Sequence, residues 1–111
     1  MKLPNGYRAK LGDKLERYSL NIQHPKGKDK ANLFRNRLGI TLENKELLET
    51  ALLESAVNNE ATLHKTDEYG TQYDVRFLMT TDVGSSLVLG CWIIRTGEEF
   101  PRLTNTYPVD Q

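Results

Sequence analysis

The 111 residues are enough for one domain with one hydrophobic core, because a domain of this size buries roughly two thirds of the surface that its unfolded chain exposes. Hydrophobic residues make up 38% and charged residues 27% of the chain, which excludes a disordered protein. Net charge is zero, but residues 1–40 contain ten Lys or Arg against three Asp or Glu (+7), and residues 41–111 contain five against twelve (−7). This split favours a local anionic partner, unless the two halves simply neutralise each other.

The sequence has no sign of a targeting or membrane segment. The longest apolar run, residues 86–94, is well short of the ~20 residues that span a membrane, and residues 1–10 contain no apolar stretch typical of a secretory signal. We therefore expect a cytoplasmic protein without membrane contact, unless the chain is part of a larger exported protein. The single Cys91 excludes an internal disulfide and a multi-cysteine metal site, and its apolar neighbours predict a small buried side chain.

The first half of the chain has the periodicity of helices. Apolar residues recur at helical spacing around residues 12–20 and predict a short amphipathic helix there. A second helix is expected over residues 29–38, with Gly39 as its stop. Thr41 is a good N-cap for a third helix, which continues to Asn58.

From residue 61 the period changes to two, which is typical of strands. Residues 71–79 alternate between apolar and polar and predict a half-buried strand, which a turn at 67–70 pairs with residues 61–66. Residues 87–95 are too apolar for a solvated face and predict a central strand. Residues 102–108 fit a final edge strand. The sequence thus predicts a single α+β domain over residues 1–111, with about three N-terminal helices packed on one face of an antiparallel sheet of about four strands.

The opposite sheet face is then free to act as a working surface. Arg76 and Arg95 lie at polar or terminal strand positions, and Arg102, Thr104 and Thr106 alternate on the last strand. If these strands are neighbours, the side chains converge on one exposed face, where arginine forks suit phosphate oxygens. The alternative is a set of surface arginines that only keep the sheet soluble.

His24 is the one histidine with a basic neighbourhood. It precedes a proline in an irregular segment, and its imidazole can exchange a proton near neutral pH, as a general acid or base must. The nearby Lys26, Lys28 and Lys30 are suited to hold a phosphate and to stabilise negative charge. The alternative is a hydrogen-bonded turn residue. His64, in the first strand, is interpreted as a surface histidine, although it is the obvious second member if the chemistry needs an acid and a base.

Two further kinds of site bear on the function: a tyrosine that stacks on a base, and a metal or cofactor site. Exposed tyrosines can stack on bases, and Tyr107 is a candidate for this contact, whereas Tyr73 belongs to the predicted core. The sequence contains no HExxH segment, no paired cysteines and no nucleophile elbow. We therefore expect neither a metal ion nor a cofactor.

Three segments carry a resemblance to a known family: "NIQHPKGKDKANLF", "DEYGTQYDVRF" and "CWIIRTGEEFPRLTNTYP". Across almost the whole chain, the sequence resembles a bacterial domain family of unknown function with a His-Pro-x-Gly-x-x-Lys-Ala segment, a Tyr-Gly-x-x-Tyr hairpin and a Trp-Ile-Ile strand followed by Pro-Arg-Leu. Such domains occur in polymorphic toxins or beside an antitoxin. The order of helices and then sheet is also distantly similar to the ribonuclease toxins grouped with barnase, EndoU, colicin D and RelE.

This resemblance implies metal-independent RNA cleavage through a 2′,3′-cyclic phosphate, with tRNA as one candidate substrate. In that reading His24 is the acid or base, Lys30 and Arg95 stabilise charge, and Thr104 or Thr106 positions the phosphate. The barnase-type set of Glu, Arg and His has no counterpart that can be assigned here. A small acidic immunity or antitoxin protein is the expected partner.

The leading interpretation is therefore a toxin-like endoribonuclease. The alternatives are a non-catalytic interaction module whose basic segment docks an acidic partner protein, and a plain RNA-binding domain. The candidate catalytic residues are His24, Lys30, Arg95 and Thr104, and the candidate substrate-binding residues are Lys26, Lys28, Arg76, Arg102, Thr106 and Tyr107.

Overall fold

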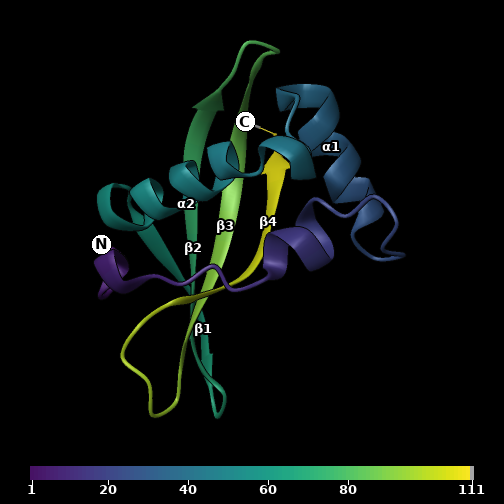
Figure 1. Cartoon of the computed structure of the whole chain (residues 1–111). Coiled ribbons are helices and arrows are strands. Elements are labelled where there is room, and N and C mark those ends of the chain that lie inside the picture. Colours follow the sequence, from purple (N-terminus) through teal and green to yellow (C-terminus); the bar gives the residue numbers. More distant parts are fainter. Residues whose placement is uncertain (111) are drawn as a thin grey trace.

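A four-stranded antiparallel sheet forms the centre of the computed structural model, which describes residues 1–110. The strands lie side by side in chain order, and the helical segments precede them in the sequence (Figure 1). The α+β class and the four strands expected from the sequence are confirmed. The strands are β1 (Ala61–Asp67), β2 (Gly70–Thr80), β3 (Ser85–Arg95) and β4 (Arg102–Val109), the α-helices are α1 (Lys28–Leu38) and α2 (Glu46–Asn58), and three short helical turns are η1 (Gly6–Arg8), η2 (Leu15–Ser19) and η3 (Leu42–Asn44).

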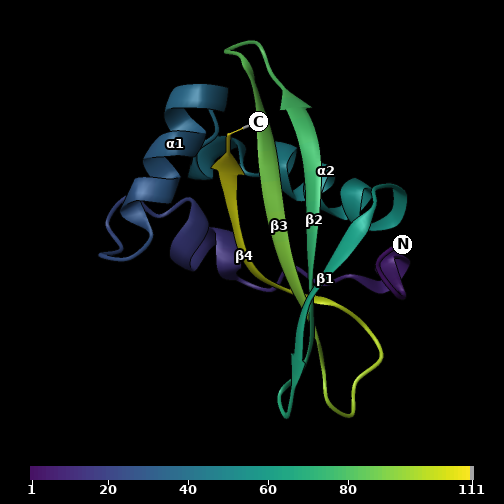
Figure 2. The same ribbon diagram turned by 180° about the vertical axis from the view of Figure 1, so that it is seen from behind.

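The helices cover one face of the sheet unevenly. Helix α2 crosses the face of β2 and β3, whereas α1 lies beside the edge strand β4 (Figure 1). Figure 2 shows the opposite face of the strands, with no helix in front of it. We call this the open face. Among the described residues, no helix is both long and apolar enough to cross a membrane.

The expectation of three comparable helices is wrong for the first of them. Residues 12–20 contain only η2, a five-residue π-helical turn in which the Leu20 N–H donates to the Leu15 carbonyl at 2.9 Å. So short a helical segment has little stability of its own, and its conformation is set by packing. Leu15, Ser19 and Leu20 are buried in this way. Gly39 does end α1, with a φ of 67°.

The hydrophobic core lies between the helices and the covered sheet face. Trp92 of β3 and Phe34 of α1 are fully buried, and Leu48 and Leu52 of α2 pack in the same cluster as Val75 of β2. Burying one such side chain stabilises the fold by about 1.5–3 kcal/mol. Side chains alternate between the two faces along a strand. Because Val75 and Trp92 are buried on this face, the residues next to them in β2 and in β3 point to the open face.

A β-bulge in β4 changes which of its residues face outward. Cys91 pairs with Asn105, but Trp92 pairs with Leu103, so Thr104 is the extra residue. An extra residue resets the alternation of side chains. The expectation that Arg102, Thr104 and Thr106 share one exposed face is therefore wrong. Thr106 is fully buried and its hydroxyl donates to the Leu89 carbonyl at 2.8 Å.

The turn that precedes α1 is packed tightly against η2. A Cβ atom added to Gly27 would lie 2.3 Å from the carbonyl oxygen of Tyr18. That oxygen belongs to the backbone, so it cannot move aside without separating the turn from η2.

We therefore expect Gly27→Ala to lower the free energy of unfolding by about 1–3 kcal/mol, the usual range for inserting an atom where there is no room. Gly12→Ala is the matched control, because a Cβ atom there has no atom within 4 Å and only the positive φ of 61° is unfavourable. Urea denaturation of both variants measures the difference. An equal or smaller loss in Gly27→Ala would contradict the close packing.

Candidate functional site

A hollow of about 270 Å³ lies where η2, the first turn of α1 and β4 meet. Three of its residues are lysines, and β4 contributes two polar residues beside the bulge. We call this hollow the basic pocket. Its lining residues are Lys14, Tyr18, Ser19, Lys26, Gly27, Lys30, Thr104 and Asn105.

Two of the three lysines of the basic pocket are held by aromatic rings and not by carboxylates. The Lys14 ammonium lies 5.2 Å from the centre of the Tyr18 ring, and the Lys30 ammonium lies 4.8 Å from the centre of the Tyr107 ring. Within residues 1–110, neither these two nor Lys26 forms a salt bridge. Three cations without counter-charges in one hollow favour an anionic ligand.

Two neutral side chains add hydrogen-bonding groups to the basic pocket. Ser19 is buried, and its hydroxyl has no hydrogen-bond partner among the described residues, which is uncommon for a buried polar group. Asn105 accepts the Thr106 N–H at 2.9 Å through Oδ1, which orients its amide NH₂ group. The Thr104 hydroxyl donates to the Cys91 carbonyl at 3.1 Å, so it must change partner before it can donate to a ligand.

His24 builds the turn that carries two walls of the basic pocket. Its Nδ1 accepts the N–H groups of Lys26 at 3.0 Å and Gly27 at 3.2 Å. The edge of the ring packs on Tyr18, with ring centres 4.7 Å apart. Since Nδ1 accepts, the neutral ring carries its proton on Nε2. This geometry is that of the hydrogen-bonded turn residue considered from the sequence.

A row of polar side chains continues from the basic pocket across the open face. The strand register places Asp74 opposite Cys91, and Cys91 opposite Asn105. His64 approaches Asp74 from β1, with 3.6 Å between Nδ1 and Oδ2. We call this row the polar strip. Its residues are His64, Asp74, Arg76, Cys91 and Tyr107.

Charged groups of the basic pocket and of the polar strip act on the same side chain, Cys91. Burial, and then the Asp74 carboxylate, raises the pKa of the Cys91 thiol to about 11, while Lys30 and Arg76 act on it in the opposite direction. Burial, then Cys91 and Asp74, also raises the pKa of Tyr107. Cys91 and Tyr107 are therefore both protonated at neutral pH. Lys30 links the two parts, because it lines the basic pocket and its ammonium lies 4.8 Å from the centre of the Tyr107 ring in the polar strip.

The structure brings five of the predicted site residues together. Lys26, Lys30 and Thr104 line the basic pocket, Tyr107 lies under the Lys30 ammonium, and Arg76 belongs to the polar strip. They come from α1, the preceding turn and two strands, β2 and β4. The lysines and the β4 residues thus lie together at the β4 edge, and their role in binding or catalysis stays a prediction.

Other predicted residues lie elsewhere. Lys28 is exposed and does not line the basic pocket. Arg95 ends β3, four residues after Cys91, or roughly 13 Å at about 3.3 Å per residue. Arg102 is held by Glu98 through two hydrogen bonds of 2.9 Å, and its guanidinium stacks on Phe100. A paired guanidinium is not free to bind a phosphate.

The contributors to the site that were not predicted from the sequence include Lys14, Ser19, Asp74 and Asn105. The spacing of Lys14 and Tyr18, four residues apart, is one signal that was available. The alternation within residues 71–79 also placed Asp74 on the face opposite the core. The position of Asn105 depends on the bulge, which has no signature in the sequence.

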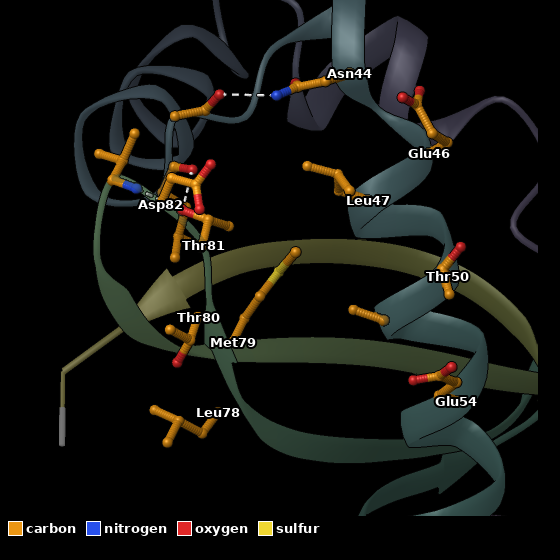
Figure 3. Close-up of a pocket in the computed structure, with 14 residues that line it drawn as sticks. Asn44, Glu46, Leu47, Thr50, Glu54, Leu78, Met79, Thr80, Thr81 and Asp82 are labelled. Atoms are coloured by element: carbon orange, nitrogen blue, oxygen red, sulfur yellow. Dashed lines mark hydrogen bonds between the residues drawn. The ribbon is translucent and has the colours of Figure 1, made fainter.

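A second hollow of about 670 Å³ separates α2 from the β2–β3 hairpin (Figure 3). Glu46, Glu54 and Asp82 line it together with the exposed apolar residues Leu47 and Leu78. Its lining contains no Lys, Arg or His. This acidic groove does not suit an anionic ligand, so the basic pocket is the better candidate.

No three side chains of His, Cys, Asp or Glu are grouped so as to hold a metal ion within residues 1–110. The expected absence of a metal or cofactor stays a prediction.

Comparisons with known proteins place the chain in a family. The model of the family described as "Domain of unknown function (DUF6883)" matches residues 2–110. The chain belongs to this family. No curated protein matches the sequence.

The fold of this DUF6883 domain is similar to a solved structure, a chain in a "Contact-dependent growth inhibition toxin - immunity protein complex" from Klebsiella pneumoniae 342. The TM-score is 0.65, and the match covers 92% of this chain and 99% of that chain, with 14% sequence identity. At this identity the match shows a common fold.

The electrostatics of the polar strip predict a slowly reacting thiol. With a pKa of about 11, Cys91 is a thiolate in roughly one molecule in a thousand at pH 8, and only the thiolate attacks a disulfide reagent. Asp74→Asn removes a group that raises this pKa, so it should accelerate the reaction with dithionitrobenzoate several-fold. Arg76→Gln removes a group that lowers the pKa and should slow the reaction. Equal rates in the two variants would show that burial alone controls the thiol.

Proposed function

We propose that this DUF6883 domain is a toxin-like endoribonuclease that cleaves RNA without a metal ion. The observation that carries the proposal is the basic pocket, in which three unpaired lysines meet polar groups of β4 at the border of an open polar sheet face. An RNA phosphate fits such a site by charge and by hydrogen bonding. The Tyr107 ring lies beneath the Lys30 ammonium and holds this cation at the edge of the site.

The proposed reaction is attack of a ribose 2′-hydroxyl on the adjacent phosphate, which leaves a 2′,3′-cyclic phosphate. It requires cations around the phosphorane and groups that accept and donate protons. Lys30 is the proposed charge stabiliser, because its ammonium borders both the basic pocket and the polar strip. Lys14 and Lys26 hold the RNA backbone, and Thr104 and Asn105 hold a phosphate in the basic pocket.

The proposed partner is a small acidic immunity or antitoxin protein. The solved structure with the same fold is described as a toxin and immunity protein complex, which supports this kind of partner. An acidic surface would cover the basic pocket and exclude RNA from it. We place the action of the domain in the cytoplasm, where its RNA substrate, with tRNA as one candidate, is found.

The direct test is incubation of the purified domain with total RNA in excess EDTA. We expect fragments that end in 2′,3′-cyclic phosphates, and a loss of rate of roughly 10–100-fold in Lys30→Ala, because that variant removes a cation from the transition state. Lys28→Ala is the matched control, since it removes an equal charge from α1 outside the basic pocket. Intact RNA with the unaltered protein would refute the proposal. Binding of RNA without cleavage would instead support an RNA-binding domain.

The role of His24 is tested by a pair of substitutions. An asparagine side chain can accept the N–H of the residue two positions later, as His24 Nδ1 does here. We therefore expect His24→Asn to retain most of the cleavage rate, whereas His24→Ala loses the turn and with it the position of Lys26. Equal loss of activity in both variants, with both folded by circular dichroism, would support the acid–base role predicted for His24 from the sequence.

A further inference from the structure

The proposed cleavage needs a group that removes the proton of the 2′-hydroxyl. We infer that His64, oriented by Asp74, is this group, and that the phosphate to be cleaved lies over the polar strip between His64 and Lys30. This inference rests on the proposed ribonuclease function and assigns its base.

A β-bulge places His64 on the open face. Thr62 pairs with Asp74 and Lys65 pairs with Gln72, which leaves His64 as the extra residue of β1 between them. Asp74 and Gln72 are both open-face positions of β2, and His64 contacts Asp74. The bulge therefore turns two consecutive residues, His64 and Lys65, toward this face. Bulges often re-aim a side chain next to an active site.

The charges around His64 distinguish it from a solvated surface residue. On its own strand, Lys65 is neutralised by Asp67 at 3.6 Å. On β2, Asp74 faces the ring and has 20% of its side chain exposed, with Arg76 on the same face two residues later. On β3, the thiol of Cys91 is protonated and neutral. Among residues 1–110, the charged group paired with the imidazole is the Asp74 carboxylate, at 3.6 Å.

A carboxylate on one side of an imidazole fixes which nitrogen reacts. Nδ1–H faces Asp74, so the lone pair of Nε2 is free to accept a proton from the substrate. The separation of 3.6 Å exceeds a hydrogen bond, as is common for catalytic pairs before the substrate binds. His24 lacks this arrangement, because its Nδ1 already accepts two backbone N–H groups.

The reaction then has the following balance. The 2′-oxygen forms a bond to phosphorus while the bond from phosphorus to the 5′-oxygen breaks. The proton of the 2′-hydroxyl moves to Nε2 of His64, and the departing 5′-oxygen takes a proton from water. The hydroxide that remains takes the proton from the His64 imidazolium, which restores the neutral ring. Lys30 and Arg76, the two cations that act on the Cys91 thiol, stabilise the charge that develops on the phosphate oxygens.

The width of the sheet sets a minimum length for the substrate. Asp74 and Asn105 are two strands apart in one row of the register, which is roughly 10 Å at about 4.8 Å per strand. One phosphate cannot contact both His64 and the far wall of the basic pocket. The substrate is therefore a single strand with at least two phosphates, of which the basic pocket holds the one that is not cleaved.

Steady-state cleavage of a short single-stranded RNA tests the assignment. We expect His64→Gln to lower kcat by at least roughly 100-fold with little change in KM, which is the usual effect of losing a general base. Asp74→Asn should lower kcat less and change the tautomer of His64, as read from the ¹⁵N shifts of the ring. Lys65→Gln, a change on the same bulge that leaves the imidazole in place, is the control and should keep kcat.

Each outcome separates the base assignment from the ribonuclease proposal. Cleavage by His64→Gln at the rate of the unaltered protein would overturn the assignment alone, while intact RNA in every sample would overturn both proposals.

A dinucleotide with a single phosphodiester should have a kcat/KM at least roughly tenfold below that of a trinucleotide, because the basic pocket is then empty. Equal values for the two lengths would overturn the two-phosphate arrangement. His64 is half-exposed, so heat denaturation should show that its variants fold.

Discussion

The helices cover one face of the sheet only, and the rest of the structure depends on this constraint. Trp92 and Val88 of β3 and Val75 of β2 are fully enclosed beneath the helices. A shift of register by one residue would expose all of them, so their burial holds the register in place. The same register aligns Asp74, Cys91 and Asn105 in one row on the open face. The polar strip is thus a consequence of the packing of the core on the other side.

Two local irregularities determine what happens at the edge of this sheet. The bulge at Thr104 turns β4 so that Thr104 and Asn105 both line the hollow beside η2. The His24 turn brings Lys26 and the start of α1 to the other side of the same hollow. Neither irregularity alone would make a pocket. The cost of leaving both segments outside regular structure is offset by their hydrogen bonds to the backbone.

Charge is separated in space as it is in the sequence. The basic pocket takes all three of its lysines from the first 40 residues, whereas Glu46, Glu54 and Asp82 of the acidic groove come from the rest of the chain. A molecule with no net charge therefore has one hollow that attracts anions and another that repels them. The polar strip contains a carboxylate, Asp74, which adds to the effect of burial in raising the pKa of Cys91.

The sequence by itself determined the elements and the chemistry available to them. Periodicity identified the four strands and the helices around residues 29–38 and 42–58, since these patterns reflect local burial. The basic segment identified Lys26 and Lys30. Only the tertiary structure decided which of these groups meet. Three features could not be predicted: the β4 bulge, the Ser19 hydroxyl without a hydrogen-bond partner, and the His24 nitrogen that accepts backbone N–H groups. They arise from contacts between segments far apart in the chain, or from turn geometry that composition does not encode. For this reason Thr106 and Arg102 were assigned to a phosphate site, while Lys14 and Asn105 were not.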